Sequence, residues 1–188
     1  YVKIIFICLF VFYTQLIVDF TLISDTFGRN ISNIFLADEK QVSEYFADKT
    51  NIIPFATVML FINAFKQGSL NPFVVLENIL GNFFVFMPFA LLVPKVFSRI
   101  NSAVKFLLFI SLSVIVIEVL QIVFLTGSAD IDDFILNVGG AMVAYGILSI
   151  PTIKLAINKF LLGEKMKLKS NAKINLTLDI LGRREDGY

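Results

Sequence analysis

Residues 103–125 read AVKFLLFISLSVIVIEVLQIVFL, and Lys105 and Glu118 are the only charged side chains among them. The hydrocarbon core of a bilayer is about 30 Å thick and is crossed by roughly 20 mainly apolar residues in helical form. Three other stretches have the same character, at residues 4–23, 73–97 and 131–153. The sequence therefore predicts an all-α membrane protein, a bundle of about four transmembrane helices.

The composition agrees with a membrane protein. Hydrophobic residues make up 57% of the chain and charged residues 16%, whereas soluble domains are nearer about half and about a quarter. The chain has no histidine and a single cysteine, Cys8, which excludes an internal disulfide and a multi-cysteine metal site. We expect no cofactor, and the formal net charge of +1 gives no indication of a nucleic-acid partner.

The stretch at residues 4–23 has one alternative reading, a secretory signal peptide. It is too long for the apolar region of a signal peptide and lacks a small-residue cleavage site, so we favour a transmembrane helix. A shorter apolar run at residues 54–65, PFATVMLFINAF, cannot cross a bilayer and suits a helix lying at the interface. Pro88 and Pro94 predict a kink in the second span.

Lysine and arginine in the short connections predict the orientation, because cytoplasmic loops carry an excess of both. Basic residues precede the first span, lie between the second and third spans and follow the fourth: Lys3, Lys95, Arg99, Lys105, Lys154, Lys159, Lys165, Lys167 and Lys169. The connection between the third and fourth spans instead carries Asp130, Asp132 and Asp133. We therefore expect both termini in the cytoplasm and this acidic turn outside.

Polar side chains within the spans gather at one depth, in the predicted outer half of the bilayer. Such residues are candidates for function, since an ionisable group at the bilayer centre costs roughly 2.5 to 3.5 kcal/mol on insertion scales. Several pairs are three or four residues apart and share a helix face, which we expect to turn toward the bundle interior. Gln15 and Asp19 of the first span lie at a similar depth. The predicted polar cluster consists of Asn51, Asn78, Asn82, Glu118, Gln121, Asp130, Asp132, Asp133 and Asn137.

Structural roles for these residues are open alternatives. Asp130 and Asp133 resemble a helix cap, and acids in a first helical turn suit the helix dipole. The asparagines could be interhelical hydrogen-bonding groups, worth about 0.6 kcal/mol each. Glu118 is harder to explain in this way, because a buried carboxylate needs a partner or a proton. The three aspartates could also hold Mg²⁺ or Ca²⁺, but without a phosphate-binding partner they are a weak indication and we predict no metal site.

Five short motifs occur in order along the chain: NIIPF at 51–55, ENILGN at 77–82, FMP at 86–88, IEVLQ at 117–121 and DIDDFILN at 130–137. In this order and spacing they resemble the VanZ-like family, across roughly residues 1–150. The family's members are small polytopic membrane proteins, and its namesake is linked to low-level resistance to the glycopeptide teicoplanin. The resemblance implies a multi-pass protein of the bacterial plasma membrane, and it implies no particular reaction.

The end of the chain resembles something unrelated. Residues 166–188, MKLKSNAKINLTLDILGRREDGY, are similar to the amino terminus of diphosphocytidyl-methylerythritol kinase. Alternation of apolar and polar residues over 174–180 predicts a short β-like fragment. The resemblance implies that Lys173 occupies a substrate-binding position. We predict a transmembrane domain at residues 1–165 and a kinase-like fragment at 166–188, which is too short to form the kinase fold or to be active.

Three functions follow as hypotheses. The first is a membrane protein of cell-envelope physiology or glycopeptide tolerance, whose partners are the lipid bilayer and a cell-wall precursor or lipid headgroup bound by the polar cluster. The second is a divalent-metal-dependent membrane enzyme acting on a phosphorylated lipid. The third is the incomplete front of a membrane-anchored kinase. For the first we expect no enzymatic activity, and the sequence identifies no catalytic residue.

Overall fold

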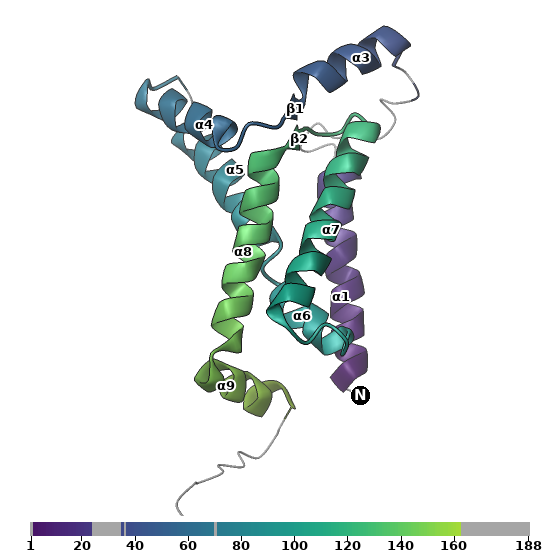
Figure 1. Ribbon diagram of the computed structural model, residues 1–188, viewed down its shortest axis with the longest axis vertical. Coiled ribbons are helices and arrows are strands. Elements are labelled where there is room, and N and C mark those ends of the chain that lie inside the picture. Colours follow the sequence, from purple (N-terminus) through teal and green to yellow (C-terminus); the bar gives the residue numbers. More distant parts are fainter. Residues whose placement is uncertain (1, 24–34, 36, 70, 163–188) are drawn as a thin grey trace, which may run out of the picture.

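Helices dominate the computed structural model, which describes residues 2–23, 35, 37–69 and 71–162. Four of them are long and apolar enough to cross a membrane: Val2–Ile23, Val75–Val96, Ala103–Val123 and Ile131–Ser149. They run roughly alongside one another in Figure 1. The predicted all-α bundle of about four transmembrane helices is confirmed.

The first span consists of α1 (Val2–Val18) and a π-helical turn, η1 (Asp19–Ile23). In this last turn the Thr21 hydroxyl donates to the Ile17 carbonyl oxygen at 2.7 Å. The span packs chiefly against α6 (Phe89–Val96), and its inward face carries the buried residues Phe6 and Ile17.

The second span is broken in two next to Pro88, one of the two prolines predicted to kink it, whereas Pro94 lies within a continuous helix. Its first half is α5 (Pro72–Val85), which begins with Asn71 accepting a hydrogen bond from the Phe73 amide at 3.0 Å. Its second half is α6, which begins after Pro88 and contains Pro94. At the break, the Tyr13 hydroxyl of α1 donates to the Val85 carbonyl oxygen at 2.7 Å. A neighbouring side chain thus satisfies a carbonyl that an unbroken helix would have used internally.

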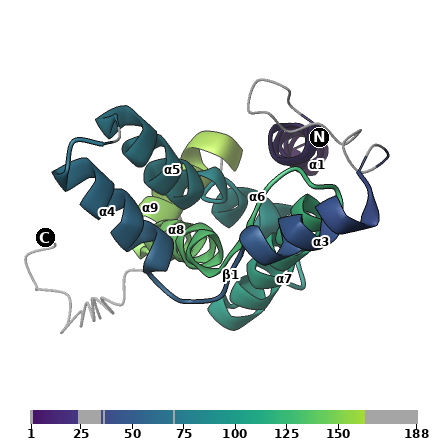
Figure 2. The same ribbon diagram turned by 90° about the horizontal axis from the view of Figure 1, so that it is seen from above.

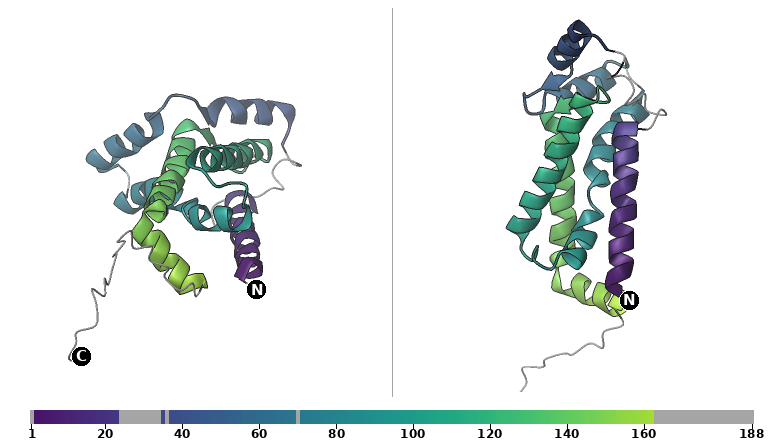
Figure 3. Two further views of the ribbon diagram at one scale, coloured as in Figure 1. Left: turned by 60° about the horizontal axis from the view of Figure 1, so that its bottom comes forward. Right: turned by 90° about the vertical axis from the view of Figure 1, so that its right-hand side faces the viewer.

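The third span is α7 (Ala103–Val123), and the fourth is α8 (Ile131–Ser149). The fourth span ends earlier than the predicted residue 153. Ile150 has an extended backbone (ψ 127°), as expected for a residue that precedes a proline. Pro151 then begins α9 (Pro151–Leu162), which lies across the lower end of the bundle in Figures 1 and 3.

Helix α8 is the centre of the packing. It contacts α5, α6 and α7, and the view along the bundle in Figure 2 places α5 and α7 on either side of it. The buried core joins all four spans through Ile17, Phe86, Phe89, Ala90, Val93, Phe106, Ile110, Val114, Val138 and Ala141. Gly140 of α8 lies so close to α5 that a Cβ there would overlap the Phe83 backbone carbonyl.

The outward faces of the spans are apolar. Phe12 of α1 is 63% exposed, and Leu108 and Leu112 of α7 are each 64% exposed. A water-soluble helix would bury such a stripe or carry polar residues there, so these faces suit contact with lipid.

The remaining elements lie at the end of the bundle opposite to α9 (Figure 3). They are α3 (Glu39–Asp48), β1 (Thr50–Asn51), α4 (Ala56–Lys66) and β2 (Ala129–Asp130). The two short strands pair in parallel, with Asn51 opposite Asp130. Helix α4 is the short apolar helix predicted from residues 54–65. The strand predicted at residues 174–180 lies outside the described residues.

Candidate functional site

The turn before α8 is hydrogen-bonded to the segment around β1 and the start of α4, more than 70 residues earlier in the chain. Asp130 is the N-cap residue of α8, and its Oδ1 accepts from the Asp132 amide at 2.9 Å. The same oxygen accepts from Nδ2 of Asn51 at 3.1 Å, and Oδ2 accepts from the Thr57 hydroxyl. The capping alternative for Asp130 is therefore confirmed, and its carboxylate also ties the loop before α4 to the bundle.

Asp132 supplies the cap that α4 lacks. The N-cap residue of α4 is Phe55, which has a left-handed backbone (φ 64°) and no capping side chain. The two carboxylate oxygens of Asp132 accept from the amides of Phe55 and Val58, the second at 3.0 Å. Asp132 is only 1% exposed. Its burial is tolerated because the amides and the positive end of the helix dipole compensate the charge.

Glu118 of α7 reaches the same turn. Its Oε2 accepts from the Asp130 backbone amide at 3.4 Å. Asn51, Thr57, Glu118, Asp130 and Asp132 thus form one connected network, which we call the loop anchor. It joins α7, α8 and the segment that leads into α4.

The third aspartate points elsewhere. Asp133 accepts a hydrogen bond from Nδ2 of Asn82 on α5, so it links α8 to α5 and does not complete a cap with Asp130. Because the three aspartates diverge, they do not form one metal-binding set. Within the described part of the chain, no three acidic, histidine or cysteine side chains are grouped so as to hold a metal ion.

Asn137 lies one helical turn deeper in α8 than Asp133. It is 5% exposed, and its side-chain oxygen is buried without a hydrogen-bond partner. Buried acceptors are nearly always satisfied, so such an atom needs an explanation. Asn78, predicted to share a face with Asn82, is exposed on α5.

Gln121 faces the first span. Its Nε2 donates to the Thr21 carbonyl oxygen at 3.3 Å, which ties α7 to the π-helical turn of η1. Gln15 of α1 and Asp19 of η1 are both exposed. The reason is helical phase: the inward face of α1 contains Tyr13 and Ile17, and Gln15 lies two residues, or about 200°, away from both.

The structure therefore separates the predicted polar cluster into parts. One part is the loop anchor, which contains Asn51, Glu118, Asp130 and Asp132. A second part is the pair of Asn82 and Asp133 with Asn137 beneath it, which we call the α5–α8 site. Gln121 lies outside both parts, on the side of α7 that faces the first span.

Three contributors were not predicted from the sequence. Thr57 lies in an apolar run, Thr21 acts through its backbone carbonyl, and the Tyr45 hydroxyl donates to the Gly127 carbonyl oxygen. The only available signal was for Thr57, whose polar side chain interrupts the apolar residues 54–62. The other two contacts depend on tertiary positions that the sequence pattern does not encode.

A bundle of four membrane-spanning helices with polar residues gathered at one end defines the class: a small polytopic membrane protein with a polar site between its helices. Residues 10–153 match the family described as VanZ/LLP1, and the chain belongs to that family. No curated protein matches the chain, and no solved structure matches it.

The second resemblance has no such support. None of the comparisons supports a kinase-like segment at residues 166–188, and the family match ends at residue 153. These residues, including Lys173, also lie outside the part of the chain that the structure describes.

Proposed function

We propose that this VanZ-family protein acts in the cell envelope by binding a polar headgroup at the α5–α8 site, from the extracytoplasmic side. The headgroup belongs to a cell-wall precursor or an envelope lipid. The observation that carries the proposal is the buried, unpartnered side-chain oxygen of Asn137, directly below the pair of Asn82 and Asp133.

The chemistry of the site favours a ligand that donates hydrogen bonds. The Asn137 oxygen and the Asp133 carboxylate are both acceptors, and carboxylates accept strongly from charged or amide donors. A ligand with amide, hydroxyl or ammonium groups would satisfy Asn137, which otherwise bears the cost of an unmet buried acceptor, about 1–3 kcal/mol. Peptide or sugar headgroups have these donors.

A cavity outside the α5–α8 site has a lining that suits a lipid tail. A cavity of about 310 Å³ lies between the first span and the end of α5, lined by Tyr13, Leu16, Ile17, Asp19, Phe20 and Val85. It combines an apolar wall with one carboxylate. This combination suits the junction between a lipid tail and a polar group.

The orientation part of the proposal rests on charge. The basic residues of the short connections lie at the α9 end, and the acidic turn lies at the opposite end. By the excess of lysine and arginine in cytoplasmic loops, the end of the bundle at which α9 lies is cytoplasmic and the α5–α8 site faces outward.

Teicoplanin tolerance is the phenotype that we expect to depend on the α5–α8 site. A deletion strain would be complemented with the wild-type gene, Asp133→Asn, Asn137→Ala or Asp48→Asn, where Asp48 is an exposed carboxylate of α3 outside the site. We expect wild type and Asp48→Asn to restore tolerance to teicoplanin, and the two site variants to leave it at the level of the deletion strain. Immunoblots of the membrane fraction would establish equal amounts of protein. Full tolerance in both well-expressed site variants would refute the proposal.

An activity assay on the purified protein distinguishes this proposal from the enzymatic alternative. The loop anchor already uses both carboxylate oxygens of Asp130 and of Asp132 in hydrogen bonds. We therefore expect no metal-dependent turnover of a polyprenyl phosphate. Such turnover, lost in Asp132→Asn, would favour the enzyme. The kinase-like reading of residues 166–188 stays a prediction, tested by reading the coding sequence beyond Tyr188.

A further inference from the structure

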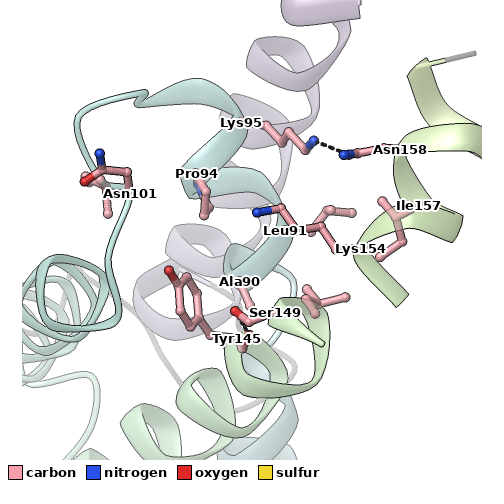
Figure 4. Close-up of a pocket in the computed structure, with 12 residues that line it drawn as sticks. Ala90, Leu91, Pro94, Lys95, Asn101, Tyr145, Ser149, Lys154, Ile157 and Asn158 are labelled. Atoms are coloured by element: carbon pink, nitrogen blue, oxygen red, sulfur yellow. Dashed lines mark hydrogen bonds between the residues drawn. The ribbon is translucent and has the colours of Figure 1, made fainter. Parts of the chain in front are cut away.

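A second pocket lies at the opposite end of the bundle from the α5–α8 site. It has a volume of about 280 Å³ and is enclosed by α6, the last turns of α8, and α9. This volume is close to the lower bound of roughly 300 Å³ for small-molecule sites, which suits a headgroup better than a whole lipid. Figure 4 shows Lys95, Tyr145 and Asn158 around this α6–α9 pocket.

Two lysines line the α6–α9 pocket, one from each of two helices. Lys95 of α6 donates from Nζ to Oδ1 of Asn158 on α9 at 2.9 Å (Figure 4). Lys154 comes from the first turn of α9. Neither lysine has a carboxylate partner in the described residues; the ion pair of Lys40 with Glu44 lies on α3.

The described segments around the pocket carry further basic residues. The segments that form this end, residues 89–106 and 138–162, contain Lys95, Arg99, Lys105, Lys154 and Lys159 and no aspartate or glutamate. The described acids lie on η1, at and on α3, on α5 and in the polar cluster. A group of cations beside a pocket creates a field that attracts an anion.

The rest of the pocket is apolar, with a few polar groups. Ala90, Pro94, Ile100 and Ile157 supply apolar wall. Tyr145 is fixed by stacking on Phe106, with ring centroids 4.6 Å apart. A soluble anion would gain little from such a wall, whereas a lipid would place its glycerol and upper acyl carbons against it.

Helix α9 places the pocket at the level of lipid headgroups. It turns across the end of α8 rather than continuing it (Figure 1), and it exposes Leu155 at 48% and Phe160 at 87%. A helix with exposed apolar residues beside lysines is typical of one lying in the membrane interface. Basic pockets between helices on the cytoplasmic side are suited to anionic headgroups.

We propose that the α6–α9 pocket binds the phosphate of an anionic phospholipid, with Lys95 and Lys154 contacting the phosphate oxygens. On binding, Lys95 exchanges or shares its hydrogen bond to Asn158 with the phosphate. This site is independent of the proposed headgroup site between α5 and α8.

The test measures binding of phosphatidylglycerol to the purified full chain in detergent by native mass spectrometry, with phosphatidylcholine and inorganic phosphate as comparison probes. Variants are Lys95→Gln, Lys154→Gln and, as a matched control, Lys159→Gln, which removes the same charge from α9 outside the pocket. We expect each pocket variant to weaken phosphatidylglycerol binding roughly fivefold, the usual contribution of one lysine near anionic lipid. Lys159→Gln should weaken binding much less than either pocket variant, and the charge-preserving Lys95→Arg should bind like wild type.

Three results would overturn the proposal. Equal weakening by all three glutamine variants would mean general attraction to the basic end, with no pocket site. Equal binding of phosphatidylcholine would exclude recognition of an anion. Competition by inorganic phosphate at the same concentration as lipid would indicate a free phosphate site. Lys154 is exposed, so its variant keeps the test decisive even where Lys95→Gln lowers stability.

Discussion

Asp132, one of the three acids that could have suggested an active site, has a structural role as a helix cap. It is buried at the start of one helix and caps the start of another, α4, through the amides of Phe55 and Val58. Without it, the amides of Phe55 and Val58 at the N-terminus of α4 would lack this acceptor. The left-handed Phe55 would also lose the contact that holds its strained backbone in place.

We expect Asp132→Ala to destabilise the protein by on the order of 2 kcal/mol or more, because each unsatisfied donor costs about 1–3 kcal/mol. The measurement is the midpoint of thermal unfolding in detergent, followed by size-exclusion chromatography after heating. Asp48→Ala, at an exposed carboxylate, is the control and should melt like wild type. An Asp132→Ala protein as stable as the control would show that the loop anchor contributes little.

Replacing Asn137 should have the opposite effect on thermal stability to replacing Asp132. Its side-chain oxygen has no partner, so replacing it with leucine removes an unmet acceptor and adds apolar surface to the interior. We predict that Asn137→Leu melts at or above the wild-type temperature while losing function, the trade-off expected where a site is kept at a cost to stability. Destabilisation by about 1 kcal/mol or more would instead favour the role of interhelical hydrogen-bonding group.

At the scale of helices, the contact of α5 with α8 positions the α5–α8 site. Gly140 lies against the backbone of Phe83, next to the Asn82 that binds Asp133. Small residues allow such close approach between membrane helices. The pair of adjacent glycines in α8 offers an unusual control, since a Cβ at Gly139 would meet nothing within 4 Å.

We therefore predict opposite effects for two neighbouring substitutions. Gly140→Ala should push α5 and α8 apart and break the Asn82–Asp133 contact. We therefore expect a lower melting temperature and loss of teicoplanin tolerance. Gly139→Ala should be neutral or stabilising by up to about 1 kcal/mol, since alanine favours helix over glycine. Equal behaviour of the two variants in the thermal assay would contradict the described packing.

The helices themselves were largely predictable, and their ends less so. Four long apolar runs specify four spans, because lipid imposes length and apolarity directly on the sequence. Proline also marked the break between α5 and α6. The end of the fourth span at Ser149 was predicted too late, because the apolar residues continue into α9 and only Pro151 signals the turn.

At the scale of the whole molecule, the sequence shows which spans carry polar residues but not how these residues pair. Helical spacing placed Asn78 with Asn82 on one face, yet only the fold shows that Asp133 meets Asn82 and that Asp130 meets Asn51. Pairing depends on how the helices are rotated and packed, which hydropathy alone does not specify. The α6–α9 pocket was likewise not predicted from the sequence, because its two lysines, Lys95 and Lys154, are far apart in the chain.

The central claim is that the polar end of the bundle faces out of the cell, and cysteine labelling in intact cells tests it most directly. Cys8 is the single cysteine, so Cys8→Ser gives a background into which Asp48→Cys or Lys159→Cys is introduced, both at exposed positions. A membrane-impermeant maleimide should label position 48 in intact cells and position 159 only after the membrane is opened. Labelling of position 159 but not 48 in intact cells would reverse the orientation and exclude an extracytoplasmic α5–α8 site.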